Sequence, residues 1–183
     1  MNGAEKILRA TDFAAHKHAG QIRKGRSAHP YINHPIGVAH LVATVGEVYD
    51  ADILVAGILH DTGEDCGVTF EELAGLFGHA AAAIVIELTD EKSLPDIVRK
   101  QRQIENAPNL SERAKVVKLA DKIDNISELV DDTPPDWPVE KCREYVEWGV
   151  SVVDGLRGTN APLEKLFDQV VERARSKFDA STT

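Results

Sequence analysis

Residues 57–65 read GILHDTGED, and this stretch decides the fold because it joins an apolar helix to a group of ionisable side chains. The residues from position 53 onward are apolar and predict a buried helix. The end of a buried helix tolerates charged groups only where an opposite charge compensates them, and a metal ion would provide that charge. The four ionisable residues of the stretch are His60, Asp61, Glu64 and Asp65.

If the helix continues through this stretch, Glu64 lies one turn after His60 and Asp65 one turn after Asp61, so all four face one cavity. The negative end of the helix dipole attracts a cation. A neutral imidazole beside a carboxylate is an ordinary ligand pair for Mn, Fe, Ni or Zn. A hydrated helix C-terminus is the alternative explanation, so the His-Asp pair needs further ligands to indicate a metal site.

Two distant residues supply these further ligands. His34 lies at the entry of a second apolar helix, in the string YINHP, and Asp121 lies in the string KLADKIDN. With His60 and Asp61 they follow the order His, His-Asp, Asp along the chain. This order resembles that of the HD-domain metal-dependent phosphohydrolases at all four positions, and it predicts one metal site built from three segments.

The composition is that of one soluble globular domain, with 183 residues of which 43% are hydrophobic and 28% charged. We expect a single domain over residues 1–183, with a motif-bearing core at about 5–165 and a disordered tail at 178–183. No apolar run is long enough to cross a membrane, and the N-terminus lacks the form of a signal peptide, so a cytoplasmic location is expected. Cys66 and Cys142 are too few for a disulfide framework and are expected to be free thiols.

The net charge of −9 argues against a nucleic-acid polymer as partner, because an acidic surface repels phosphate backbones. The charge is unevenly distributed, however. Residues 1–46 carry six Lys and Arg against two acidic residues, which leaves +4. A local basic patch suits a small phosphorylated ligand, although ordinary solvated surface charge explains it equally well before the metal site is considered.

Apolar spacing predicts helices along the whole chain and no sheet, so we expect an all-α fold. Residues 20–33 are polar and basic, and they predict a loop that leads into His34. On the helix that carries Asp121, Asn125 and Glu128 continue a polar stripe that faces the metal. The predicted helices span residues 4–18, 35–46, 52–61, 69–78, 79–88, 96–106, 111–130, 139–156 and 163–177.

Four strings resemble the hydrolase domain of the Rel/SpoT family more specifically. The stretch from residue 144 to 160 is similar to the stand-alone small alarmone hydrolases of that family, the group that includes the metazoan SpoT homologue. Together these similarities cover about residues 5–165. The four strings are AHKHAGQIRK at 15–24, PYINHPIGVA at 30–39, HDTGED at 60–65 and KLADK at 118–122.

The resemblance implies a compact helical HD domain that hydrolyses the 3′-pyrophosphate of ppGpp and pppGpp, giving pyrophosphate and GDP or GTP, usually with Mn²⁺. It implies Glu64 and Asp65 as the acidic pair that positions or deprotonates the attacking water. Chemistry agrees, since a divalent ion makes water more acidic and a neighbouring carboxylate accepts the proton. The metal ligands that it implies, for Mn²⁺ or another divalent transition metal, are His34, His60, Asp61 and Asp121.

The same resemblance implies a nucleotide site. Arg23 and Lys24 match positions that hold the nucleotide, with a guanidinium suited to stack on guanine and an ammonium suited to phosphate. Asn125 both donates and accepts hydrogen bonds, as recognition of a base edge requires. Lys141 and Tyr145, one turn apart, complete the pocket from a later helix.

Two departures from the family pattern leave the substrate open. The string DNISEL at 124–129 stands where Rel/SpoT proteins commonly have HNMRTL, so Glu128 replaces a threonine near the base pocket. Asp96 stands where animal members have a lysine. Other nucleotides, namely pppApp or the 2′-phosphate of NADPH, are therefore alternatives, and so is an inactive protein that binds the alarmone and signals to a partner. We expect no synthetase domain in a chain of this length.

Overall fold

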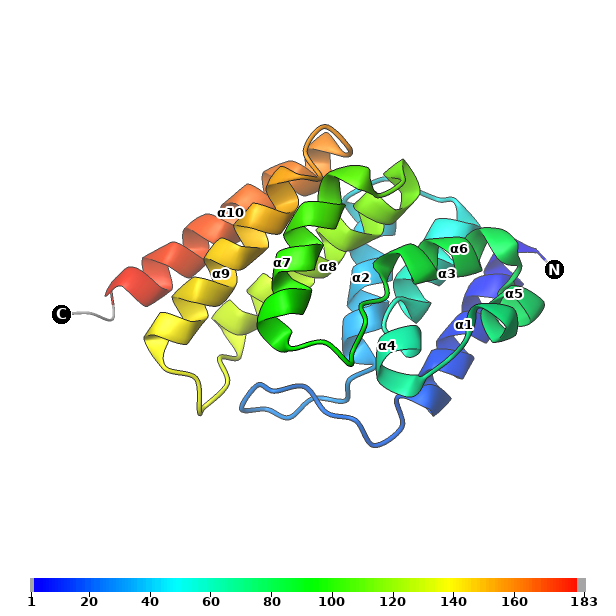
Figure 1. Ribbon diagram of the computed structural model, residues 1–183, viewed down its shortest axis with the longest axis horizontal. Coiled ribbons are helices and arrows are strands. Elements are labelled where there is room, and N and C mark those ends of the chain that lie inside the picture. Colours follow the sequence, from blue (N-terminus) through cyan, green and yellow to red (C-terminus); the bar gives the residue numbers. More distant parts are fainter. Residues whose placement is uncertain (1, 181–183) are drawn as a thin grey trace.

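The structure is a computed structural model that describes residues 2–180, and within them it contains helices but no strand (Figure 1). One isolated antiparallel bridge pairs Ile22 with Pro30 in the loop after the first helix. The predicted all-α fold is confirmed. The elements are α1 (Gly3–Lys17), α2 (Asn33–Thr44), α3 (Ala51–Leu59), α4 (Thr62–Cys66), α5 (Phe70–Phe77), α6 (His79–Leu88), α7 (Asp96–Asn106), the 3₁₀ turn η1 (Ala107–Asn109), α8 (Glu112–Asp131), α9 (Val139–Asp154) and α10 (Ala161–Asp179).

Helix α8 is the central element of the fold. It contacts α2, α3 and α6 on one side and α9 and α10 on the other, and Figure 1 shows it between these two groups. Residues 116–123 of α8 are all buried, so this part of the helix is enclosed on every face. A helix that is enclosed on every face is usually apolar on every face. The charged residues that this part of α8 carries therefore need partners inside the protein.

Side-chain caps begin the helices where the sequence indicates. The hydroxyl of Ser111 accepts a hydrogen bond from the Ala114 amide at the start of α8. Thr69 does the same for the Glu72 amide at the start of α5. The predicted bounds of all long helices agree with the structure to within two residues at each end.

The helix predicted over residues 52–61 ends two residues earlier than expected, and it does not continue through Asp65, which was the condition for placing all four ionisable side chains on one helix face. Helix α3 ends at Leu59, and a separate short helix, α4, starts at Thr62. The hydroxyl of Thr62 donates to the Leu59 carbonyl at 2.7 Å, which satisfies a carbonyl at the end of α3. Next to it, Gly63 lets α4 approach the end of α6 closely, because a Cβ at position 63 would lie 2.8 Å from Thr89 Oγ1.

Residues 178 and 179, which were predicted to belong to a disordered tail, are helical. Helix α10 extends to Asp179, and Phe178 is buried in the hydrophobic core. The rest of the predicted tail, residues 181–183, lies outside the described residues. Both cysteines are free, as predicted. No helix in residues 2–180 combines the length and the apolar character that crossing a bilayer requires.

Replacing Phe178 by alanine tests this boundary. We expect the free energy of unfolding to fall by about 3–5 kcal/mol, because the substitution leaves a cavity in the core. Tyr49→Ala, at a side chain that is 76% exposed, is the control and should change it by no more than about 0.5 kcal/mol. Urea denaturation measures both, and equal effects of the two variants would show that the end of α10 does not belong to the core.

Candidate metal centre and active site

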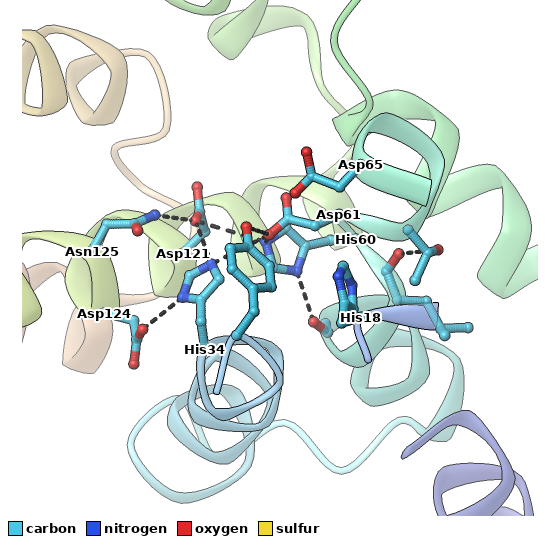
Figure 2. A network of polar contacts seen from close by, with 12 residues as sticks. His18, His34, His60, Asp61, Asp65, Asp121, Asp124 and Asn125 are labelled. Atoms are coloured by element: carbon cyan, nitrogen blue, oxygen red, sulfur yellow. Dashed lines mark hydrogen bonds and ion pairs between the residues drawn. The ribbon is translucent and has the colours of Figure 1, made fainter. Parts of the chain in front are cut away.

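Three segments bring the four predicted metal ligands together (Figure 2). His34 lies in the first turn of α2, His60 and Asp61 link α3 to α4, and Asp121 lies in the buried part of α8. Ligand atoms of His34, His60 and Asp121 all lie within 4.8 Å of one another. Asp61 lies against both imidazoles, so the four side chains come together although the first and the last are 87 positions apart in the sequence.

The distances between these atoms are close to those expected for ligands of one ion. Asp61 Oδ2 lies 3.0 Å from His60 Nε2 and 3.5 Å from His34 Nε2. Asp121 Oδ1 lies 3.3 Å from His34 Nε2 and 3.7 Å from His60 Nε2. Nitrogen and oxygen ligands about 2.0–2.2 Å from one metal ion are about 3.0–3.6 Å apart in tetrahedral or octahedral geometry.

The orientation of the two imidazoles also fits a metal ion. His34 Nδ1 donates to Asp124 Oδ2 at 2.6 Å, and His60 Nδ1 donates to the Gly57 carbonyl at 2.8 Å. Because a carboxylate and a carbonyl only accept, each Nδ1 carries the hydrogen and each Nε2 has a free lone pair. The buried Nε2 of His60 has no hydrogen-bond partner among the described residues. Lone pairs that face carboxylates in a buried site need a proton or a metal ion between them.

The two carboxylates are held by further hydrogen bonds. The hydroxyl of Tyr31, in the loop before α2, donates to Asp61 Oδ2 at 2.8 Å. Asn125 Nδ2 donates to Asp121 Oδ1 at 2.5 Å, and Lys122 Nζ lies 3.2 Å from Asp121 Oδ2. These contacts fix the acidic groups before any ion arrives, which favours a defined coordination geometry.

The electrostatics of the cluster favour positive charge. Burial opposes the charge on each group, but the carboxylates of Asp61 and Asp121 outweigh it and raise the pKa of His60 to about 10. In return, His60 and His34 hold the pKa of Asp61 below its ordinary value. Lys122 and the two imidazoles likewise lower the pKa of Asp121. Without a metal ion the cluster therefore binds protons, and a divalent cation can take their place.

The predicted acidic pair lies on α4, beside the cluster. Glu64 Oε1 accepts from Arg99 Nη1 at 2.8 Å, and Asp65 Oδ1 accepts from Lys92 Nζ at 2.6 Å. Burial and the neighbouring carboxylates, chiefly Asp90, raise the pKa of Glu64, while Arg99 opposes the increase. Glu64 is thus a stronger base than an ordinary glutamate.

A cavity of about 680 Å³ opens beside these residues, a volume within the range of small-molecule sites. Of the predicted site residues it is lined by Asp61, both acidic residues and most of the predicted nucleotide contacts. Lys92 and Arg99, which the sequence analysis did not assign to the site, line it as well. The residues that line the cavity include Arg23, Lys24, Tyr31, Asp61, Glu64, Asp65, Lys92, Asp96, Arg99, Asn125, Glu128, Trp137 and Tyr145.

Arg23 is held at the cavity wall by the polar stripe of α8. Its Nη2 donates to Asn125 Oδ1 at 2.9 Å, and its guanidinium forms an ion pair with Glu128. The guanidinium carbon lies 5.4 Å from the ring centroid of Tyr31. The predicted direction of the stripe, toward the metal ligands and the cavity, agrees with these contacts.

Lys141 is the one predicted nucleotide contact that is not part of the cavity wall. It is exposed, and its Nζ lies 4.4 Å from the ring centroid of Trp137, which does line the cavity. Tyr145 lines the cavity and packs between Trp137 and Trp148 with its ring steeply inclined to both, at centroid distances of 5.5 Å and 5.2 Å. Trp148 packs against the core.

The family model of the HD domain matches residues 10–145, a range that contains the four clustered residues and the acidic pair. The chain belongs to the HD-domain family. This membership and the likeness to the Rel/SpoT hydrolases were both predicted from the motifs, and the comparisons with known proteins confirm them.

Relatives with this HD domain cover nearly the whole chain. A guanosine-3′,5′-bis(diphosphate) 3′-pyrophosphohydrolase MESH1 of Danio rerio is 48% identical over 90% of this chain and 91% of its own. The MESH1 protein of Homo sapiens is 46% identical over 93% and 95%, respectively. A solved structure described as "A metazoan ortholog of SpoT hydrolyzes ppGpp and plays a role in starvation responses" superposes with a TM-score of 0.89, at 42% identity and with 92% and 94% coverage.

Adding a divalent transition-metal ion to chelator-treated protein should raise its melting temperature. An ion that binds only the folded state stabilises it by about 2.7 kcal/mol at a concentration 100 times its Kd. His60→Gln should lose most of this increase, whereas His40→Gln, on the exposed face of α2, should keep it. Differential scanning fluorimetry measures the shift, and the same shift in wild type and His60→Gln would contradict a metal site at the cluster.

Proposed function

We propose that the protein is a (p)ppGpp 3′-pyrophosphohydrolase, which converts ppGpp or pppGpp and water into GDP or GTP and pyrophosphate. The observation that carries this proposal is one arrangement. Asp61, the acidic pair and four basic residues line one cavity of nucleotide size. The other three proposed ligands, His34, His60 and Asp121, lie close together beside Asp61. The relatives that are named for this reaction, at 46–48% identity, support the same substrate.

We propose that His34, His60, Asp61 and Asp121 hold one divalent ion and that this ion is Mn²⁺. Two imidazoles with two carboxylates form a mixed nitrogen and oxygen donor set, which suits manganese and its neighbours in the first transition row. When bound, such an ion supplies Lewis acidity, which makes water more acidic and neutralises charge on a phosphoryl oxygen. The other steps depend on side chains of the chain itself.

Glu64 is proposed to accept a proton from the attacking water. Its raised pKa makes it a better proton acceptor than an ordinary carboxylate at neutral pH. Asp65, the next residue on α4, is proposed to orient the water, and Lys92 Nζ donates to its carboxylate. Arg99 contacts Glu64 and thereby fixes the direction of the carboxylate.

The nucleotide is proposed to lie along the wall formed by the loop before α2 and by α8. Arg23 stacks on the guanine, Lys24 attracts a phosphate group, and Asn125 bonds to the base edge. Tyr145 closes the pocket from α9. Lys141 is proposed to reach the phosphates from outside the wall, since its contact with Trp137 places it at the rim.

One observation, the ion pair between Arg23 and Glu128, favours substrates other than (p)ppGpp. This pair places a carboxylate beside the proposed base pocket, where it changes which hydrogen-bond donors a base must offer. We therefore propose pppApp and the 2′-phosphate of NADPH as candidate substrates of the same site. Rates on ppGpp, pppApp and NADPH, measured side by side with one enzyme preparation, discriminate among them.

We further propose that one domain over residues 1–183 carries the activity and acts in the cytoplasm on small molecules. The net charge of −9 disfavours a nucleic-acid polymer as a partner. A purely binding role is less favoured, because a protein that only senses the nucleotide needs neither the clustered ligands nor the acidic pair.

The purified protein should release pyrophosphate from ppGpp in the presence of Mn²⁺. Glu64→Gln and Asp65→Asn should each lower kcat about 10²–10⁴-fold with little change in KM, because general acid–base catalysis contributes that much. Glu71→Gln, an exposed acid on α5, is the control and should leave kcat unchanged. No pyrophosphate at micromolar enzyme would refute the proposed activity, and full turnover by Glu64→Gln would refute the role of the base.

Arg99→Gln should move the acidic limb of the pH–rate profile to higher pH. Arg99 lowers the pKa of Glu64, so its loss raises that pKa further and a higher pH is needed to obtain the deprotonated base. Arg102→Gln is the matched control on the same helix, since Arg102 is half exposed and pairs with Glu91. A limb that stays in place, or one that moves equally in both variants, would exclude Glu64 as the group that titrates.

A further inference from the structure

Asp124 contacts one of the proposed metal ligands on the side away from the metal. It lies on α8 one turn after Asp121, and its Oδ2 accepts the hydrogen of His34 Nδ1 at 2.6 Å. The other ring nitrogen of His34 then presents its lone pair to the cluster, 3.3 Å from Asp121 Oδ1 (Figure 2). Helix α8 thus supplies both a proposed ligand and the group that orients a second ligand.

The two histidines of the cluster are oriented by different means. His60 Nδ1 donates to the Gly57 carbonyl in its own helix, so the backbone of α3 fixes that ring. The ring of His34 is oriented instead by a side chain from another helix. This contact can be removed without any change in backbone hydrogen bonding, which makes its contribution measurable.

Gly37 is matched to the carboxylate of Asp124. It lies on α2 one turn after His34, where the helix packs against α8. A Cβ at Gly37 would come within 2.5 Å of Asp124 Oδ1, and the three atoms nearest to it all belong to Asp124. Glycine weakens a helix interior relative to alanine, so α2 taken alone would favour alanine here. The space that glycine leaves is filled by the Asp124 carboxylate.

We propose that Asp124 is a positioning residue for the metal site and that Gly37 provides the space in which its carboxylate reaches His34. The inference rests on the metal site proposed above. A carboxylate behind a ligating histidine fixes the ring, selects the tautomer and makes the other nitrogen a stronger donor. Loss of such an outer partner typically weakens metal binding about 10–100-fold.

The test is a calorimetric titration of the metal-free full-length chain with MnCl₂. Asp124→Ala and Gly37→Ala should each raise the Kd for Mn²⁺ about 10–100-fold, the first by removing the carboxylate and the second by displacing it. Asp124→Asn keeps the shape and one acceptor oxygen but loses the charge. A smaller increase in Kd is expected for this variant, which is the one least disposed to misfold.

The double variant Gly37→Ala/Asp124→Ala is decisive. When the carboxylate is absent, the methyl group at position 37 meets no obstacle from Asp124, so the Kd should equal that of Asp124→Ala alone. If the effects of the two substitutions multiply instead, Gly37 acts through something other than Asp124, and the inference is overturned.

Gly75→Ala on α5 is the matched control, because a Cβ there meets no atom within 4 Å. It should leave the Kd unchanged. Thermal denaturation of the metal-free variants separates positioning from folding: lower stability with an unchanged Kd would overturn the inference. A wild type that binds no Mn²⁺ would refute the metal site and this inference together. Equal Kd values for wild type and all variants would refute only the inference and leave the proposed function intact.

Discussion

Two imidazole nitrogens and two carboxylates face one another inside this protein, and their mutual charge constrains everything around them. Groups of this kind lose hydration when they are buried, and the loss is large unless opposite charges lie close. His34 and His60 are 3% and 4% exposed, so water does little to stabilise them. The cluster is stable only because α2, the α3–α4 link and α8 each bring a part of it to the same point, with a proton or a metal ion to balance the charge.

The break between α3 and α4 separates two of the proposed ligands from the acidic pair. His60 and Asp61 lie in the link, whereas Glu64 and Asp65 lie on the short helix α4. Cations from the following segment, Arg99 and Lys92, pair with the two acids. These pairs supply the acids with positive partners of their own, and both acids face the cavity.

Local patterns were sufficient to predict the helices and the proposed ligands. The apolar run before His60 and the polar stripe through Asp121 are periodic features of single segments, and the family motifs related the segments to one another. The contacts that support the site were not predictable in this way, because they join residues through packing. Tyr31 and Arg99 carry no local signal of their role, and Asp124 was not singled out although it begins the string DNISEL. The break after Leu59 was missed because a Thr62 hydroxyl, rather than a Gly or Pro, satisfies the end of the helix.

Helix α8 has two parts with different freedom to vary. Its enclosed part, residues 116–123, belongs to the core and carries Asp121, so a substitution there affects stability and chemistry together. Its last two turns carry Asn125 and Glu128, which face the cavity and are partly exposed. Substitutions in these turns can therefore change the cavity wall while the enclosed part of the helix stays packed. One helix thus joins a buried anchor to a solvent-facing surface.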